Sequence, residues 1–149
     1  MSSNDEKKIL EQQFDVTKID IEIITLERMF IDKIFAAEFY YIRRMYYDVA
    51  KHLYDISVLF NNSKIQNLLN NKKELNKLIQ YKRQEEKVRI GGINENTEIK
   101  DFDYFKLDFD DELITNFKNM QNKYVLSEEF KIDINTVKNV LAKIYNKII

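Results

Sequence analysis

Apolar residues recur at helical spacing along most of this chain. From residue 26 to residue 42 they return every three or four positions, which places them on one face of a helix. Thr25 stands just before this stretch and is a favoured N-cap residue. We therefore predict a helix over 26–42. Its buried side is expected to comprise Met29, Phe30, Ile34, Ala37 and Tyr41.

The same periodicity predicts further helices downstream. They are expected over 48–59, a short stretch around 65–69, 74–89, 109–124 and 135–148. The buried face of the helix over 109–124 is expected to run through Leu113, Phe117, Met120 and Tyr124. Gly91-Gly92 interrupts the pattern, and 93–107 is expected to be a connecting loop. These elements predict a mainly α protein, a multi-helix bundle.

One segment near the N-terminus has a different pattern. Val16–Ile24 alternates apolar and polar residues and is rich in β-branched side chains, which predicts a leading β-strand. A strand needs partners for its backbone groups, and no second strong strand is evident downstream. The strand either belongs to a minor ribbon or to a sheet that lies outside this polypeptide, and we favour the second. Residues 1–24 would then be a residual strand segment and 25–149 a helical domain.

Composition narrows the possible classes of protein. The 149 residues suit one domain, and the absence of proline with only two glycines favours long helices. No cysteine is present, which excludes disulfides and cysteine-based zinc sites. The N-terminus lacks the apolar core of a signal peptide, and no apolar run approaches the roughly 20 residues that cross a bilayer. We expect a cytoplasmic protein with no membrane contact.

Two charged side chains are placed symmetrically about a predicted turn. Lys33 and Asp55 are each 11 residues from Arg44, where the first two helices would form a hairpin. Because antiparallel helices rise equally per residue, positions equidistant from the turn come to lie side by side. Lys33 and Asp55 should therefore be in direct or water-mediated contact. This contact is either a structural ion pair or one wall of a site that handles phosphates.

Charge is distributed unevenly along the second half of the chain. Residues 72–89 hold seven basic and three acidic residues, whereas 95–112 holds eight acidic and two basic residues. The basic stretch is either a solvated helix face or an RNA-binding face. The RNA contacts would come from Lys82, Arg83, Lys87 and Arg89. The acidic stretch is either a solvated loop, a loop that folds back on the basic helix, or a contact for a basic partner.

Two short motifs resemble a known family. Residues 27–33 read Glu-Arg-Met-Phe-Ile-Asp-Lys and residues 51–55 read Lys-His-Leu-Tyr-Asp. They resemble the two downstream motifs of the AbiEii/AbiGii nucleotidyltransferase toxin family. In that family the first motif is an Arg-Thr-Phe-x-Glu-Lys-like helix that follows a strand. The second motif is a helix that contains Arg/Lys-His-x-Tyr-Asp. The matching positions are Arg28, Phe30, Lys33, Lys51, His52, Tyr54 and Asp55. Met29 replaces the threonine and Asp32 the glutamate of the first motif.

The resemblance implies a site built on these motifs. Lys33 would place a point charge on the triphosphate, and Asp55 would act as general base for the acceptor hydroxyl or orient Lys33. Alternatively, Asp55 pairs with Lys51 four residues earlier. The resemblance further implies nucleotide or phosphate contacts from Arg28, Lys51 and His52. His52 has a competing interpretation as a hydrogen-bonded structural residue, and Tyr54 as a packing residue.

The resemblance also implies parts that this sequence lacks. Family members carry an upstream core with a Gly-Ser turn for the nucleotide phosphates and a pair of strand aspartates for Mg²⁺, and these 149 residues contain neither. Asp101 and Asp103 are downstream and are not expected to bind metal. The chain thus resembles the C-terminal part of an enzyme that transfers a nucleotide from an NTP.

In such an enzyme the acceptor is a tRNA in some relatives, and a cognate antitoxin is the expected partner. Because phosphoryl transfer depends on positioned metal and cations, we expect this chain to be inactive without an upstream nucleotidyltransferase core and to bind neither Mg²⁺ nor NTP alone. The alternative function is a non-catalytic helical module that binds another protein.

Overall fold

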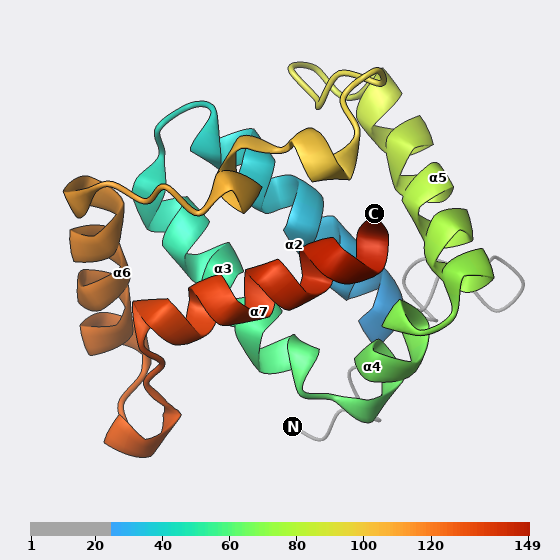
Figure 1. Cartoon of the computed structure of the whole chain (residues 1–149). Coiled ribbons are helices and arrows are strands. Elements are labelled where there is room, and N and C mark those ends of the chain that lie inside the picture. The colour runs from blue at the N-terminus through green and yellow to red at the C-terminus, as the bar shows by residue number, and fades with distance from the viewer. Residues whose placement is uncertain (1–24) are drawn as a thin grey trace, which may run out of the picture.

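The computed structural model describes residues 25–149, in which the chain forms α-helices and short 3₁₀ turns and no strand. The helices are α2 (Leu26–Tyr41), α3 (Tyr46–Phe60), α4 (Ser63–Leu69), α5 (Lys72–Val88), α6 (Asp111–Tyr124) and α7 (Ile134–Ile148) (Figure 1). The 3₁₀ turns are η1 (Ile99–Asp101), η2 (Asp103–Lys106) and η3 (Glu128–Phe130). The mainly α prediction is confirmed. The strand predicted at 16–24 lies outside the described residues.

Side-chain caps explain where most of these helices begin. The Thr25 hydroxyl accepts from Arg28 N at the start of α2, as predicted. Asn62, Asn71, Asp110 and Asp133 play the same part for the four helices after α3. The predicted helix over 109–124 actually starts two residues later, because Asp110 adopts the extended cap conformation and accepts from Leu113 N. The other predicted helices are present with shifts of a few residues at their ends.

The α2–α3 hairpin is the centre of the bundle. Four residues join the two helices, and one of them, Arg44, has a φ of 57°, the left-handed conformation that lets the chain reverse. Helices α4 and α5 pack against α2, whereas α6 packs against α3. Helix α7 crosses in front of the hairpin and contacts α3 (Figure 1). The turn predicted near Arg44 is therefore confirmed.

The apolar face of α2 is wider than the sequence pattern indicated. Phe30, Ile34 and Ala37 are buried as predicted, and Ile31 and Phe35 are buried beside them. The prediction for Met29 is wrong, since it is 38% exposed, whereas Tyr41 is partly buried and packs against the core. The width follows from position, because α2 has α3, α4, α5 and η2 around it.

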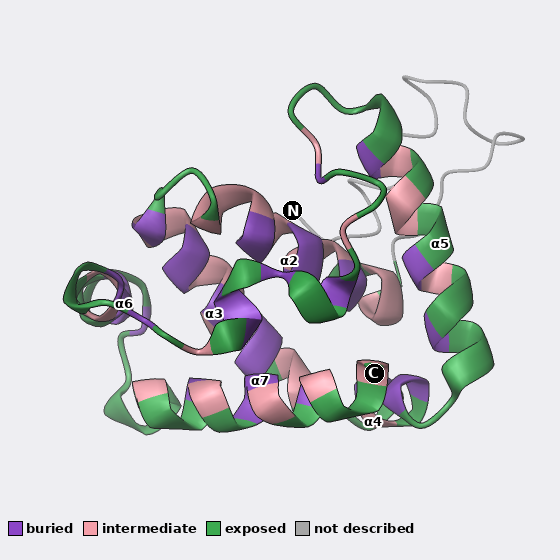
Figure 2. Cartoon of the chain, turned by 45° about the horizontal axis from the view of Figure 1, so that its top comes forward, coloured by how far each residue is buried: buried purple, intermediate pink, exposed green. Residues whose placement is uncertain are grey.

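The segment expected to be a connecting loop is part of the core. Phe102 and Tyr104 in 93–107 have 0% exposure, and η1 and η2 interrupt the loop with helical turns. The segment crosses the hairpin as a partly buried ribbon (Figure 2). Its aromatic side chains pack on α2, where the Phe102 ring meets Phe35 edge to face with 5.3 Å between centroids. The segment is a connecting loop, as predicted, but it is only partly solvated, because these rings bury apolar surface against the hairpin.

A buried carboxylate holds this segment on α2. Glu38 is 4% exposed and accepts hydrogen bonds from Asp103 N at 2.8 Å and Tyr104 N at 3.4 Å. The Tyr104 hydroxyl donates to the Ile34 carbonyl at 2.7 Å. Burial raises the pKa of Glu38 above its ordinary value, and the hydrogen bond from Asp103 N opposes that rise. The backbone of residues 103–104 therefore depends on a side chain more than 60 residues earlier.

Removing that carboxylate should destabilise the protein. We expect Glu38→Ala to lower the free energy of unfolding by about 2–4 kcal/mol, because the buried N–H of Tyr104 loses its acceptor at roughly 1–3 kcal/mol and the part-buried N–H of Asp103 loses a hydrogen bond worth about 1 kcal/mol. The measurement is urea unfolding followed by circular dichroism. The matched control is Glu129→Ala, an exposed glutamate, which should change stability by no more than about 0.5 kcal/mol. Equal stability of the two variants would contradict the role of Glu38.

Candidate functional site

The two motifs meet in an ion pair between α2 and α3. Lys33 Nζ donates to Asp55 Oδ2 at 2.8 Å, which confirms the contact predicted from their equal spacing about Arg44. The two side chains are 26% and 42% exposed, so the pair lies at the surface rather than in the core. Asp55 is not paired with Lys51, whose Nζ instead lies over the Tyr47 and Tyr124 rings, 5.2 and 5.0 Å from their centroids.

His52 lies beside this ion pair, and its imidazole ring is held in place by stacking. The imidazole stacks on Tyr40 with a centroid separation of 5.5 Å and an interplanar angle of 13°. Its Nδ1 is buried without a hydrogen-bond partner among the described residues, so the expected hydrogen-bonded structural role is not seen at this atom. Burial lowers the pKa of His52, and the charge of Lys33 lowers it further. A neutral imidazole can exchange a hydrogen bond with a ligand but supplies no positive charge.

The remaining charged residues of the first motif face a different helix. Arg28 is paired with Glu85 of α5, and Asp32 Oδ1 lies 3.4 Å from Lys82 Nζ. Because Arg28 and Asp32 are four residues apart, they share one face of α2, while Lys33 is turned toward α3. The first motif thus joins α2 to α5 and also supplies the lysine at the α3 side.

The residues considered for RNA binding have partners within the fold. The side chain of Lys82 is only 13% exposed and its Nζ is 3.3 Å from Glu86 Oε1. Arg83 donates to the Thr97 carbonyl at 2.8 Å, and Lys87 Nζ is 3.5 Å from Glu95 Oε2.

Arg89, the fourth residue considered for RNA binding, also has a partner within the fold. Its guanidinium lies over the Phe39 ring, 3.9 Å from the centroid. The acidic stretch therefore folds back on the basic helix, as one of the sequence interpretations stated. RNA binding by these four residues stays a prediction.

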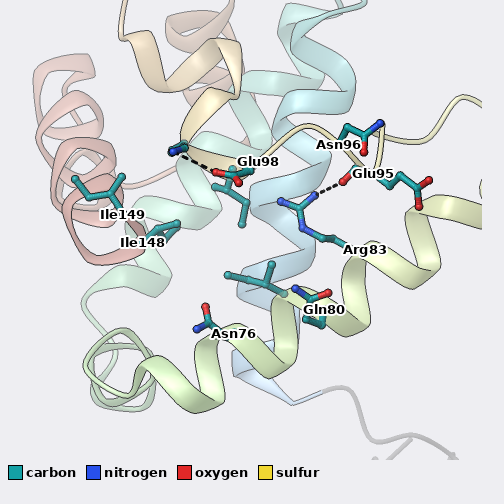
Figure 3. Close-up of a pocket in the computed structure, with 11 residues that line it drawn as sticks. Asn76, Gln80, Arg83, Glu95, Asn96, Glu98, Ile148 and Ile149 are labelled. Atoms are coloured by element: carbon teal, nitrogen blue, oxygen red, sulfur yellow. Dashed lines mark hydrogen bonds and ion pairs between the residues drawn. The ribbon is translucent and has the colours of Figure 1, made fainter.

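One large hollow lies away from the ion pair. It has a volume of about 650 Å³ and is bounded by α5, residues 95–100 and the last two residues of the chain (Figure 3). The Arg83 side chain points into it and is held by backbone carbonyls (Figure 3). Neither Lys33 nor Asp55 lines this hollow. It therefore adds no group to the site built on the two motifs.

A second hollow is continuous with the ion pair. This groove, about 670 Å³, lies between α3 and the end of α6 and is lined by Lys51, Tyr54 and Asp55 of the second motif. Tyr54 donates through its hydroxyl to the Phe130 carbonyl at 2.8 Å, so it fixes the outer wall of the groove. Tyr124 lines the same groove. It was expected to be buried and is 55% exposed, which corrects that prediction.

The described residues do not fit the metal ion that the family resemblance implies. No group of three or more His, Cys, Asp or Glu side chains among residues 25–149 is arranged to hold one. Asp103, half of the Asp-x-Asp sequence, is paired with Lys106 at 3.2 Å. The groups available for chemistry here are therefore a lysine cation, a carboxylate and a neutral imidazole, and no step through a metal is derived from them.

Comparison with known proteins identifies one family. The family model described as nucleotidyl transferase AbiEii toxin, type IV TA system, matches residues 4–140. No curated protein and no solved structure matches the chain. Within residues 25–149, none of the helices has the length and apolar character needed to cross a membrane.

The stability effect of the ion pair should be small. Half-exposed ion pairs contribute about 0–1 kcal/mol, so Lys33→Ala and Asp55→Asn should each change the free energy of unfolding by less than about 1 kcal/mol. Urea unfolding measures this, with Lys100→Ala, from an exposed pair with Glu98, as the control. A loss of several kcal/mol would show that the pair is primarily structural.

The lowered pKa of His52 predicts a pH dependence. The ordinary value is 6.5, so the unfolded chain binds the proton more readily than the folded one. The stability due to the neutral imidazole is thus complete above about pH 6.5 and is lost as pH falls toward the folded pKa. His52 is the only histidine, so NMR titration of its ring resonances gives the folded pKa directly.

Unfolding measurements provide the second readout. The free energy of unfolding should fall between about pH 7.5 and pH 5 more steeply for the wild type than for His52→Gln. Glu38 titrates in both proteins with the opposite sign, so the difference isolates His52. A ring pKa at or above 6.5 would contradict the burial of this imidazole.

Proposed function

We propose a role in nucleotide transfer for this chain, which belongs to the AbiEii nucleotidyltransferase toxin family. In this role Lys33 places its ammonium against the phosphates of a nucleoside triphosphate. Asp55 orients Lys33 and receives the proton of the acceptor hydroxyl. The observation that carries the proposal is the 2.8 Å contact between Lys33 and Asp55, one residue from each motif.

The surroundings of the ion pair suit a binding site. Both side chains keep part of their surface open to solvent, so a ligand can reach them without unfolding the hairpin. A lysine ammonium carries three donors on a flexible stem and can shift from a carboxylate to a phosphate oxygen. Asp55 has a second oxygen that is not bonded to Lys33, which leaves an acceptor for a substrate proton.

The metal chemistry of this family must come from other residues in this proposal. Mg²⁺ would neutralise charge on the transferred phosphoryl group, and the described residues offer no set of ligands for it. We therefore assign the metal ligands and the phosphate-binding Gly-Ser turn to a nucleotidyltransferase core. That core is either a further part of the same polypeptide or a separate chain. Without it, the present chain would be inactive and would hold neither metal nor NTP.

Further parts of the proposal follow from the family description. A type IV toxin–antitoxin system implies a cognate antitoxin as a functional partner. We propose a tRNA as the acceptor and the cytoplasm, which supplies both tRNA and nucleoside triphosphates, as the location. The active enzyme would join the α-phosphate of the triphosphate to the acceptor oxygen and break the α–β phosphoanhydride bond, so that pyrophosphate leaves and the hydroxyl proton passes to Asp55.

A helical interaction module is the second candidate, and one surface favours it. Val88 and Ile90, at the end of α5, are 84% and 98% exposed, and Ile42 at the α2–α3 turn is 49% exposed. Arg43 donates to the Gly91 carbonyl at 2.6 Å, which brings the two segments together. Exposed apolar side chains gathered in this way are typical of protein-binding surfaces. In this case Lys33 and Asp55 would be structural.

The transfer assay separates the two candidates. The purified chain should transfer no label from NTPs to tRNA in the presence of Mg²⁺. If a nucleotidyltransferase core is encoded nearby upstream, its addition should give transfer. In the combined system Lys33→Ala should lower the rate by about 10²-fold or more, the typical effect of losing one transition-state electrostatic contact. Lys100→Ala, which removes an exposed lysine far from the motifs, should leave the rate unchanged.

Two results would contradict the proposal. Transfer by this chain alone that survives both Lys33→Ala and Asp55→Ala would place the chemistry elsewhere. Absence of transfer in the combined system would favour the interaction module.

A further inference from the structure

The groove beside Asp55 has a wall of exposed aromatic rings. Tyr124, the last residue of α6, is 55% exposed, and Phe130 in η3 is 61% exposed. Both line the groove together with Lys51, Tyr54 and Asp55. The molecule thus leaves two large rings open to solvent next to the candidate site. We propose that this groove binds a single-stranded end of a nucleic acid, and that this nucleic acid is the acceptor of the transfer reaction.

The first argument is the combination of rings with cations. Lys51 Nζ and Lys123 Nζ lie 5.0 and 5.5 Å from the centroid of the Tyr124 ring. Neither lysine has a carboxylate partner among the described residues, whereas the charge of Asp55 is balanced by Lys33. Lys51, which lines the groove, therefore brings a positive charge without a carboxylate partner to its aromatic wall, and Lys123 lies at the same ring. Rings that stack on bases and lysines that neutralise the backbone are the two elements of single-strand binding sites.

The second argument is that the wall of the groove is already formed. The Tyr54 hydroxyl holds the Phe130 carbonyl, and the buried Gln121 donates to the Ile132 carbonyl and accepts from Ile132 N, at 2.8 and 2.6 Å. These bonds fix the C-terminal end of η3 and the residues just after it to α3 and α6. A ligand then binds without first ordering the segment, which lowers the entropic cost of association.

The third argument concerns which nucleotide the groove receives. Asp55 lines the groove, but Lys33 does not and approaches the carboxylate from α2. Asp55 is therefore shared by two features, the lysine proposed to bind phosphate, which comes from α2, and the groove, which lies between α3 and α6. If Lys33 holds the triphosphate and Asp55 takes the proton of the acceptor hydroxyl, the acceptor approaches from the groove. This step rests on the proposed function and assigns the groove to the acceptor strand, not to the base of the NTP.

The volume of the groove is consistent with such an occupant. Ligand sites in proteins are roughly 300–1,000 Å³, and the groove has about 670 Å³. Leu126, which is 92% exposed, lies at the rim and offers further apolar surface to a base.

Direct binding to RNA tests the inference without requiring catalysis. The full chain is titrated into a fluorescein-labelled single-stranded RNA of mixed sequence at low salt, and anisotropy gives the dissociation constant. Tyr124→Leu and Phe130→Ala should each weaken binding by about 5- to 100-fold, the loss expected for one stacked base. Tyr124→Phe keeps the ring and should bind within about 2-fold of the wild type.

Two controls make the result specific. Tyr81→Ala removes a tyrosine on α5 that is similarly exposed, at 59%, and does not line the groove, so it should leave the affinity unchanged. Circular dichroism and the unfolding midpoint establish that each variant is folded. Lys51→Ala should reduce the slope of log affinity against log salt by about 0.7, the value for one phosphate contact on a single strand.

The outcomes separate this inference from the proposed function. Absence of RNA binding, or equal binding by the wild type, Tyr124→Leu and Phe130→Ala, would overturn the groove assignment. Displacement of the RNA by free NTP would also overturn it. The same holds if an apolar peptide displaces the RNA and the ring substitutions have no effect. None of these results would alter the effect of Lys33→Ala on transfer, which tests the proposed function by itself.

Discussion

The antiparallel pairing of α2 with α3 is the interaction on which the rest of the structure depends. The two helices are joined by four residues, and the left-handed Arg44 allows the reversal within that short distance. Equal rise along both helices then brings Lys33 opposite Asp55 at 2.8 Å. The outer surfaces of the hairpin receive α5 on one side and α6 on the other. A change in the length of the turn would shift this register and separate the two motifs.

Neighbouring residues of the motifs have different structural tasks. In the first motif, Arg28 and Asp32 connect α2 to α5, while Lys33 turns toward α3. In the second, Tyr54 holds the wall of the groove and Asp55 brings a carboxylate to its lining. The helical period explains this division, since residues one apart point about 100° away from each other and residues four apart share a face. Motif residues that contact no ligand can therefore still be required for the site.

Two carboxylates in this fold differ because of their surroundings. Glu38 is buried, and its hydrogen bonds from backbone N–H groups make it important for stability. Asp55 is 42% exposed and pairs with a lysine in a solvent-accessible position, where an ion pair contributes little to stability. Burial thus separates the residue that maintains the fold from the residue proposed to act on a substrate. Lys82 is likewise only 13% exposed and lies among acidic side chains, where it connects α5 to Asp32 of α2.

The sequence by itself determined the elements that depend on nearby residues. Helical periodicity and cap residues such as Thr25 located the helices, because backbone hydrogen bonds and caps are local. Equal spacing about Arg44 was enough to predict the contact of Lys33 with Asp55, since a hairpin converts sequence distance into spatial register. The motifs also indicated the family, which the match over residues 4–140 confirmed.

Only the tertiary structure decided which surfaces have partners. The acidic segment 93–107 has the composition of a solvated loop, yet Tyr104 is buried because Glu38, distant in sequence, accepts its backbone N–H. The periodicity of α6 suggested a buried Tyr124, but this ring meets only Tyr47 and Lys51 at the surface of α3 and stays 55% exposed along a groove. Neither outcome could be read from local pattern, because burial is set by elements that meet only after the chain has folded.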